Sequence, residues 1–249
     1  YVVQLLMPNY IDYSIIVAIP AAFLVSGLMG VLIERLVRGM RSDMATEGLN
    51  VRDAAIVKDS VYRDEKGDMV VEVYLKEGNQ YYNRLLWVEP DGKQLYYDKK
   101  HLFTFAKEHH RYTAGEKQLV VNIKGWNIAS FVCFDLRFPV WCRHSAKQNY
   151  DAALFIASWP KTRCEQWNAL LRARAIENQS YVVAVNRVGT DGNNIAYQGD
   201  TQLLDPLGER LMHRMDDESV DIIRLEKKRL DSVRNQFPFL AEADQFRFV

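Results

Sequence analysis

The sequence predicts an α/β fold, because short apolar segments of strand character alternate with a longer segment of helix character. The runs 128–132, Ala152–Ala157 and Tyr181–Asn186 are almost wholly apolar, which is typical of strands buried on both faces. Between the second and third runs, Thr162 and Glu165 have the spacing of a capping box and predict the start of a helix. Strands interleaved with a helix in this way indicate one α/β domain.

The remaining elements follow from the same patterns. The predicted helix runs to about Asn178 and presents one apolar face, made of Trp167, Leu170, Leu171 and Ala175. Alternating or apolar segments bounded by turn residues predict strands at 2–6, 69–74, 81–88, 119–123, 126–133 and 201–204. Two hairpins result, over 69–88 and 119–133. Residues 42–68 are expected to form a surface helix followed by a turn, and residues 189–194 a turn-rich loop.

Composition limits what the protein can do. The chain has 249 residues and 48% hydrophobic content, which is enough for a sizeable core. Its 32 basic and 32 acidic residues cancel, so no cationic field favours nucleic acid. The three cysteines form neither a disulfide framework nor a metal-ligand spacing, which suits a reducing compartment such as the cytoplasm. No zinc motif, phosphate loop or dinucleotide fingerprint is present, so neither a metal nor an organic cofactor is expected.

The N-terminal part, residues 1–50, is atypical and leaves two alternatives open. Residues 15–33 form a stretch of nineteen residues without a charge, followed by basic residues, which is long enough for a membrane span. Pro20, Gly27 and Gly30 divide the stretch into a helix-like and a strand-like half, as expected for pieces buried in an α/β domain. We therefore expect a single domain over 1–249, with membrane association through 15–33 as the alternative.

Cys133 is the first candidate for chemistry, because it stands where an apolar strand meets a polar turn. The segment 131–141 reads FVCFDLRFPVW. Strand ends beside loops are frequent sites of catalytic groups, and a thiol becomes a nucleophile when a neighbouring base or cation favours the thiolate. The alternative is a packing role, since free cysteine is among the most buried residue types.

The segment from Cys133 to Pro139 resembles the nucleophile turn of the nitrilase superfamily, the carbon-nitrogen hydrolases, and is most similar to its omega-amidase-like branch. Three further motifs carry the resemblance: Tyr97, Lys99, His101 and Leu102; Glu108 in the loop that follows; and Ser158, Trp159 and Pro160 after a strand. The resemblance implies an α-β-β-α sandwich, a homodimer and a Glu-Lys-Cys catalytic set. A strand would point Lys99 and Lys100 to opposite faces, so that one of them can face inward.

The catalytic glutamate that the resemblance requires is best matched by Glu34. Gly39 and Asp43 follow it at the family's spacing, but Ile33 replaces the usual proline before it and Arg35 and Leu36 stand near the place of the usual aromatic residue. The alternative is a charge at the surface end of a strand. If Glu34 is not the base, the chain is a catalytically impaired or membrane-tethered relative that acts as a binding or scaffold module.

The resemblance implies a complete reaction. Glu34 would be the general base, Cys133 the nucleophile and Lys99, with a backbone N–H after Cys133, the oxyanion stabiliser, while Glu108 holds Lys99. Phe134 and Trp159 are the expected substrate-binding residues. The expected partner is a small linear amide, most similar to those of omega-amidases that hydrolyse 2-oxoglutaramate or related 2-oxo acid amides. Faster labelling of Cys133 than of Cys142 and Cys164 would separate the enzyme from the scaffold.

Overall fold

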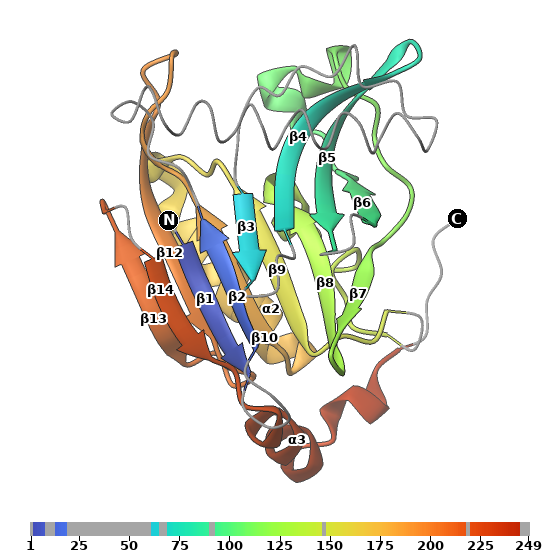
Figure 1. The fold of residues 1–249 in the computed structure, drawn as a ribbon, viewed down its shortest axis with the longest axis vertical. Helices are drawn as coiled ribbons and strands as arrows, with labels where there is room; N and C mark the ends of the chain where they lie inside the picture. Colours follow the sequence, from blue (N-terminus) through green and yellow to red (C-terminus); the bar gives the residue numbers. More distant parts are fainter. Residues whose placement is uncertain are drawn as a thin grey trace.

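A computed structural model describes residues 2–7, 13–18, 61–64, 69–89, 93–145, 148–217 and 220–244. The strands of these segments form two sheets (Figure 1). The first sheet has, in spatial order, β14 (Val220–Arg224), β1 (Val2–Met7), β2 (Tyr13–Ala18), β3 (Val61–Asp64), β4 (Met69–Glu77), β5 (Gln80–Val88) and β6 (Gln94–Asp98). Its strands are antiparallel neighbours except for the parallel pair of β1 and β14.

The second sheet follows the order β11 (Val188–Thr190), β12 (Ala196–Leu204), β10 (Tyr181–Asn186), β9 (Ala152–Ala157), β8 (Trp126–Val132) and β7 (Val120–Ile123), with β13 (Arg210–Met215) paired to β12. Two α-helices are described, α2 (Cys164–Asn178) and α3 (Lys227–Gln236). The 3-10 helices are η2 (Thr104–Ala106), η3 (Glu108–His110), η4 (Cys133–Arg137), η5 (Lys161–Arg163) and η6 (Phe239–Glu242).

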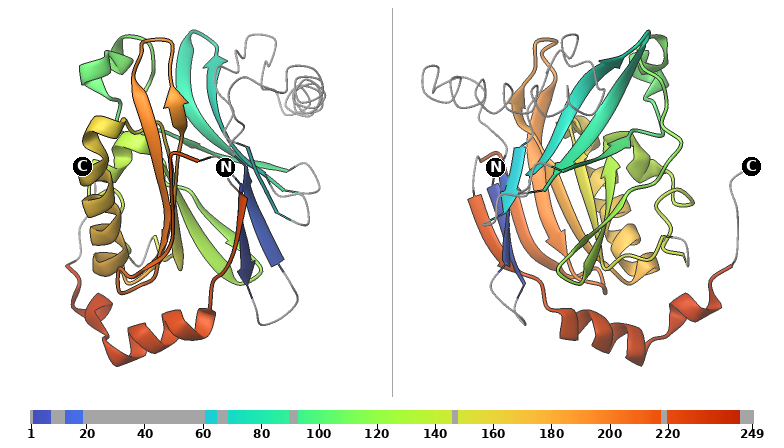
Figure 2. Two further views of the ribbon diagram at one scale, coloured as in Figure 1. Left: turned by 90° about the vertical axis from the view of Figure 1, so that its left-hand side faces the viewer. Right: turned by 45° about the vertical axis from the view of Figure 1, so that its right-hand side comes forward.

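The layers pack around one apolar core. Figure 2 shows α2 along one face of the second sheet and the first sheet on the opposite face. Trp167 and Leu171 of α2 are fully buried in the same cluster as Phe131 and Phe155 of the second sheet, and Trp87 of the first sheet belongs to that cluster too. Burying each such side chain stabilises the fold by roughly 1.5–3 kcal/mol. The expected apolar face of the helix is therefore confirmed.

The sheet topology brings several strand ends to one edge. β8, β9 and β10 run parallel, with Val132 opposite Ile156 and Ala157 opposite Asn186. Parallel strands end at the same edge of a sheet, and in open α/β sheets that edge is where ligands bind. The residues that follow β8 and β9, Cys133 and Ser158, are therefore brought near each other.

Most of the expected strands are confirmed, and the differences concern where elements begin and end. In the first hairpin the turn is only Gly78 and Asn79, because Lys76 and Glu77 extend β4. Three more differences concern one strand that begins earlier than expected and two strands that were not expected. β12 begins at Ala196 rather than at 201, the loop expected at 189–194 begins as strand β11, and residues 61–64 form strand β3 inside the segment expected to be a helix and a turn.

The capping box expected at Thr162 and Glu165 is wrong. Residues Lys161–Arg163 form the 3-10 helix η5, so the α-helix begins at Cys164 with Arg163 as its N-cap and no side chain capping it. The 3-10 turn that follows Pro160 takes the place of the extended N-cap that a capping box requires.

The structure describes only part of the N-terminal region for which a buried segment and a membrane span were the alternatives. Residues 15–18 lie in β2, which pairs with β1 and β3, so a helix there is wrong. The β-branched residues Ile15, Ile16 and Val17 favour the strand. Within the part of the chain that the structure describes, no helix combines the length and the apolar character that crossing a membrane requires. Residues 19–33 and the candidate base Glu34 lie outside the described residues.

Candidate active site

Cys133 is the first residue of η4 and follows β8 directly. Its φ of 45° lies in the left-handed region, which is unfavourable for a residue with a Cβ and costs of order 1–3 kcal/mol. The side chain is half-buried and lines a cavity of about 260 Å³. The sharp turn thus ends the buried strand and leaves the thiol accessible from the cavity.

Lys99 lies beside this thiol and is paired with Glu108. It follows the last residue of β6, its side chain is 2% exposed, and its Nζ lies 3.0 and 2.8 Å from the two carboxylate oxygens of Glu108. Burial alone would lower the pKa of Lys99, but negative charge at Cys133 and at Glu108 raises that pKa above its ordinary value. The cation therefore persists in a buried place, and it favours negative charge on the sulfur in turn.

The loop around this ion pair is closely packed. The Oε2 atom of Glu108 also accepts a hydrogen bond from the backbone N–H of Phe103, at 2.8 Å. On the other side, the N–H of Gly115 donates to the backbone oxygen of Lys99 at 3.0 Å. A Cβ on Gly115 would lie 2.1 Å from the backbone oxygen of Asp98, so only glycine allows this approach.

A buried carboxylate links the lysine motif to the nucleophile turn. Asp135 is fully buried and accepts hydrogen bonds from the hydroxyl of Tyr97 at 2.6 Å and from the backbone N–H of Val132 at 3.1 Å. Its other oxygen lies 2.9 Å from both the backbone nitrogen and Nδ1 of His101. Asp135 thereby fixes the position of Cys133 relative to Lys99, although the two motifs are distant in sequence.

The cavity has an aromatic and cationic wall opposite the ion pair. Phe134 and Trp159 both line it, as expected of substrate-binding residues. Two guanidinium groups join them: the Cζ atom of Arg137 lies 4.9 Å from the ring centre of Trp159, and that of Arg163 lies 5.1 Å from the ring centre of Phe103. No carboxylate of the described residues forms an ion pair with either arginine.

The hairpin of β11 and β12 closes the remaining side of the cavity. Asp191 and Tyr197 line it, and the hydroxyl of Tyr197 donates to Asp191 at 2.9 Å. Burial alone would raise the pKa of Asp191, but hydrogen bonds from the backbone N–H groups of Ile195 and Asn193 lower it below its ordinary value. The carboxylate is thus used to hold the hairpin in shape.

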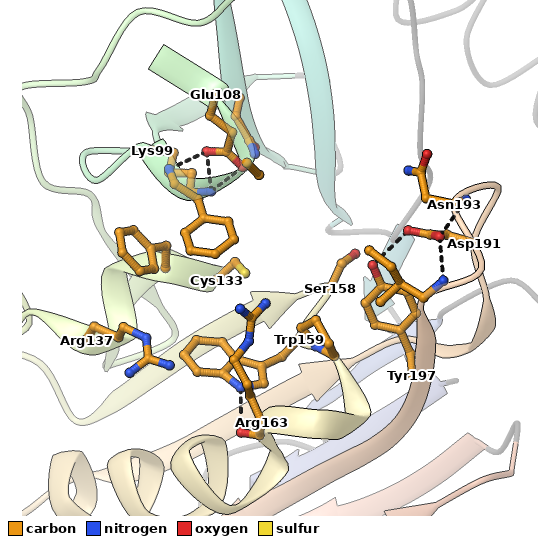
Figure 3. A pocket seen from close by; sticks show the side chains of 16 residues that line it. Lys99, Glu108, Cys133, Arg137, Ser158, Trp159, Arg163, Asp191, Asn193 and Tyr197 are labelled. Atoms are coloured by element: carbon orange, nitrogen blue, oxygen red, sulfur yellow. Dashed lines mark hydrogen bonds and ion pairs between the residues drawn. The ribbon is translucent and has the colours of Figure 1, made fainter. Parts of the chain in front are cut away.

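Figure 3 gathers these groups in one view, with Lys99 and Glu108 on one side of Cys133 and Arg137, Trp159 and Arg163 on the other. Five of the six site residues expected from sequence line one cavity: Lys99, Glu108, Cys133, Phe134 and Trp159. Glu34 lies outside the described residues. Arg163 was not predicted from the sequence. Its position three residues after the Trp159-Pro160 pair, which follows a strand end, could have indicated that it lies at the site. Within the described segments, no group of three or more histidine, cysteine or acidic residues could hold a metal ion.

The chain belongs to the carbon-nitrogen hydrolase family, whose model matches residues 64–235. The resemblance found in the sequence is thereby confirmed. Among solved structures, a carbon-nitrogen hydrolase superfamily protein of Xanthomonas campestris, which carries an arsenic adduct in its active site, is similar with a TM-score of 0.68 and 42% identity. The match covers 72% of this chain and 70% of that one, and it confirms the nitrilase-type sandwich.

Curated relatives define the branch more closely. Omega-amidase YafV of Yersinia enterocolitica is 47% identical over 165 residues, which are 66% of this chain and 64% of that protein. The 2-oxoglutaramate amidase of Bacillus subtilis is 29% identical over 167 residues, covering 67% of this chain and 64% of that protein. The chain therefore spans 64% of the length of these relatives and resembles the omega-amidase branch.

Proposed function

We propose that the chain hydrolyses the terminal amide of a small 2-oxo acid amide such as 2-oxoglutaramate, with Cys133 as the nucleophile. The observation that carries the proposal is the left-handed turn at Cys133, which opens the thiol to a cavity that also holds the Lys99–Glu108 ion pair. The names of the similar proteins support the substrate class.

In the proposed reaction the Cys133 sulfur attacks the amide carbonyl and forms a tetrahedral oxyanion. The ammonium group of Lys99 and the backbone N–H of Phe134 stabilise that negative charge, and such stabilisation usually contributes most to the rate of acyl transfer. The thiol proton passes through the general base to the amide nitrogen, which leaves as ammonia. Water then hydrolyses the thioester and releases the 2-oxo acid. Glu34 is the proposed base for both halves, on the strength of its spacing to Gly39 and Asp43.

Glu108 supports this chemistry by keeping Lys99 charged and in place. A buried ammonium without a partner would lose its proton or turn toward water, because desolvation of an isolated charge is costly. With both carboxylate oxygens of Glu108 within 3.0 Å, the amine stays protonated where the oxyanion forms.

Two guanidinium groups support the proposal that the substrate carries a negative charge. Arg137 and Arg163 line the cavity, and a guanidinium binds a carboxylate through two parallel hydrogen bonds. A 2-oxo acid amide carries a carboxylate at the end opposite its amide, so it would extend from Cys133 toward the arginines.

The proposal is tested by incubating the protein with 2-oxoglutaramate and measuring ammonia and 2-oxoglutarate together. Both products are expected in equal amounts from the parent protein and from the control Cys164→Ala, and neither from Cys133→Ala. Parent protein that releases no ammonia from this substrate or from neutral linear amides would contradict an amidase function.

The role of the arginines is tested with a second substrate. Replacement of Arg163 by Met should lower kcat/KM for 2-oxoglutaramate roughly tenfold to a hundredfold, the range of a lost hydrogen bond to a charged group. The same variant should hydrolyse pentanamide, which has no carboxylate, as the parent does. Equal losses on both substrates would assign Arg163 a structural role instead.

Two expectations remain predictions, the homodimer that the family resemblance implies and the cytoplasmic location that the cysteine pattern suits. A homodimer is expected, and sedimentation equilibrium of the chain would test it. A cytoplasmic location is expected, and fractionation of cells that produce the protein would test it against membrane association.

A further inference from the structure

Asn83 is a buried amide on the wall of the cavity, in β5. The residue is 3% exposed, and its Oδ1 accepts no hydrogen bond from any described residue. The register of β5 puts Asn83 on the same face as Leu85 and Trp87, which pack in the core between the sheets. Polar atoms buried in this way nearly always have a partner, so an unpaired acceptor on a cavity wall indicates a ligand group that donates to it.

The position of Asn83 relative to Lys99 suggests which group that is. The N–H of Lys99 donates to the backbone oxygen of Asn83 at 2.9 Å, and the ladder that pairs Arg84 with Asp98 places Asn83 directly opposite Lys99. Side chains opposite each other on adjacent strands project from the same face with Cβ atoms roughly 4.5–5.5 Å apart. An ammonium donor and a carboxamide acceptor therefore project side by side into the cavity that contains Cys133.

This pair is complementary to the two halves of a primary amide. The carbonyl oxygen of such an amide needs a donor, and its NH₂ group needs an acceptor. We propose that the Oδ1 atom of Asn83 accepts a hydrogen bond from the amide NH₂ of the substrate while Lys99 faces the carbonyl oxygen. Asn83 is then a substrate-contacting residue that selects primary amides. The inference rests on the proposed amidase function and deepens it.

The contact acts in the first half of the reaction. The bond between the Cys133 sulfur and the carbonyl carbon forms, the carbon–nitrogen bond breaks, and the thiol proton leaves on the nitrogen as ammonia. Asn83 holds one N–H of that nitrogen and so directs its lone pair toward the incoming proton. An ester of the same acyl group has no N–H, so its reaction does not use this contact.

The test compares an amide with an ester. Asn83→Leu keeps the approximate shape of the side chain and removes both polar atoms, and Asn83→Ala provides a second variant if the first does not fold. For either variant we expect kcat/KM for 2-oxoglutaramate to fall roughly tenfold to a hundredfold, while kcat/KM for the corresponding methyl ester stays at the parent value. Ser180→Ala is the matched control, because the Ser180 hydroxyl is also fully buried without a partner among the described residues but does not line the cavity.

Each other outcome has a distinct meaning. Equal losses on amide and ester would overturn the inference, because Asn83 would then act by positioning Lys99 or by supporting the fold. Unchanged turnover of both substrates would also overturn it. Parent protein that is inactive on the amide would contradict the proposed function itself, which distinguishes the two failures.

Discussion

Cys133 and Cys142 belong to the same segment of chain but lie in opposite environments. Cys142 is 1% exposed, its Sγ donates to the backbone oxygen of Asp135 at 3.3 Å, and burial raises its pKa well above the ordinary value. Cys133 is half-buried, opens to a cavity and interacts with the ammonium of Lys99. The turn at Cys133 and the buried cation, rather than the residue type, therefore distinguish a candidate nucleophile from a packing residue.

The largest expected effect is the loss of activity in Cys133→Ala. The substitution removes the nucleophile and only a few atoms, so turnover should fall by more than roughly a thousandfold while the melting temperature changes little. Cys142→Ala is the matched control and should keep its turnover, since the Cys142 thiol contacts only the protein interior. Turnover of Cys133→Ala within about tenfold of the parent value would reject a thiol mechanism.

Glu34→Gln tests whether a general base acts on Cys133 and not on Cys142. The amide keeps the shape of the side chain but accepts no proton, so turnover should fall roughly a hundredfold to ten-thousandfold. Alkylation of Cys133 by iodoacetamide near neutral pH should slow as well, because the thiol then stays protonated, whereas Cys142 should be unaffected. Parent-like turnover and labelling would place Glu34 at the surface and require another base.

Glu108→Gln tests the cation that distinguishes the two environments. The glutamine amide keeps one acceptor oxygen, so Lys99 loses its negatively charged partner and one of the two hydrogen bonds that hold its amine in place. A loss in kcat/KM of roughly a hundredfold is expected, at the lower end of the cost of removing an oxyanion donor. Circular dichroism should confirm an intact fold, and kcat/KM within about threefold of the parent value would show that Lys99 is positioned by other groups.

The smallest expected effect is a loss of stability at high pH, which arises from buried groups in the interior around Cys142. Burial raises the pKa of the Cys142 thiol and of the Tyr97 and Tyr150 hydroxyls well above their ordinary values. These groups lose protons more readily in the unfolded chain, so their contribution to stability is full below about pH 8.5 and declines as pH rises. The free energy of unfolding should fall by about 1.4 kcal/mol per pH unit for each group that titrates.

Urea denaturation between about pH 8 and 11 measures this decline. Tyr150→Phe should reduce the slope above about pH 10, because one titrating group is removed. A free energy of unfolding that stays constant over this range would contradict the inferred burial of the three groups.

Local motifs made much of the site predictable. Lys99, Glu108 and Cys133 each stand in a short pattern, and the expectation that one residue of the Lys99–Lys100 pair faces inward is confirmed by the burial of Lys99. Strands 152–157 and 181–186 were predictable because uninterrupted apolar runs of that length are typical of strands buried on both faces.

The parts that sequence could not predict depend on tertiary contacts. Asp135 links Tyr97, His101 and the turn at Cys133, yet no local pattern relates residues so distant in the chain. Arg163 resembles a solvated charge at a helix start until the fold places it on the cavity wall. Similarly, the strand β3 has only four residues, two of them charged, and its pairing with β2 and β4 defines it.

The most direct test of Cys133 as the nucleophile is detection of the thioester intermediate. The protein is mixed with 2-oxoglutaramate, quenched in acid within one turnover and digested, and the mass of each cysteine-containing peptide is measured. We predict an acyl adduct on the peptide that contains Cys133 and unmodified peptides for Cys142 and Cys164. Ammonia release with no adduct under conditions that trap thioesters, or an adduct on Cys142 or Cys164 alone, would contradict this role of Cys133.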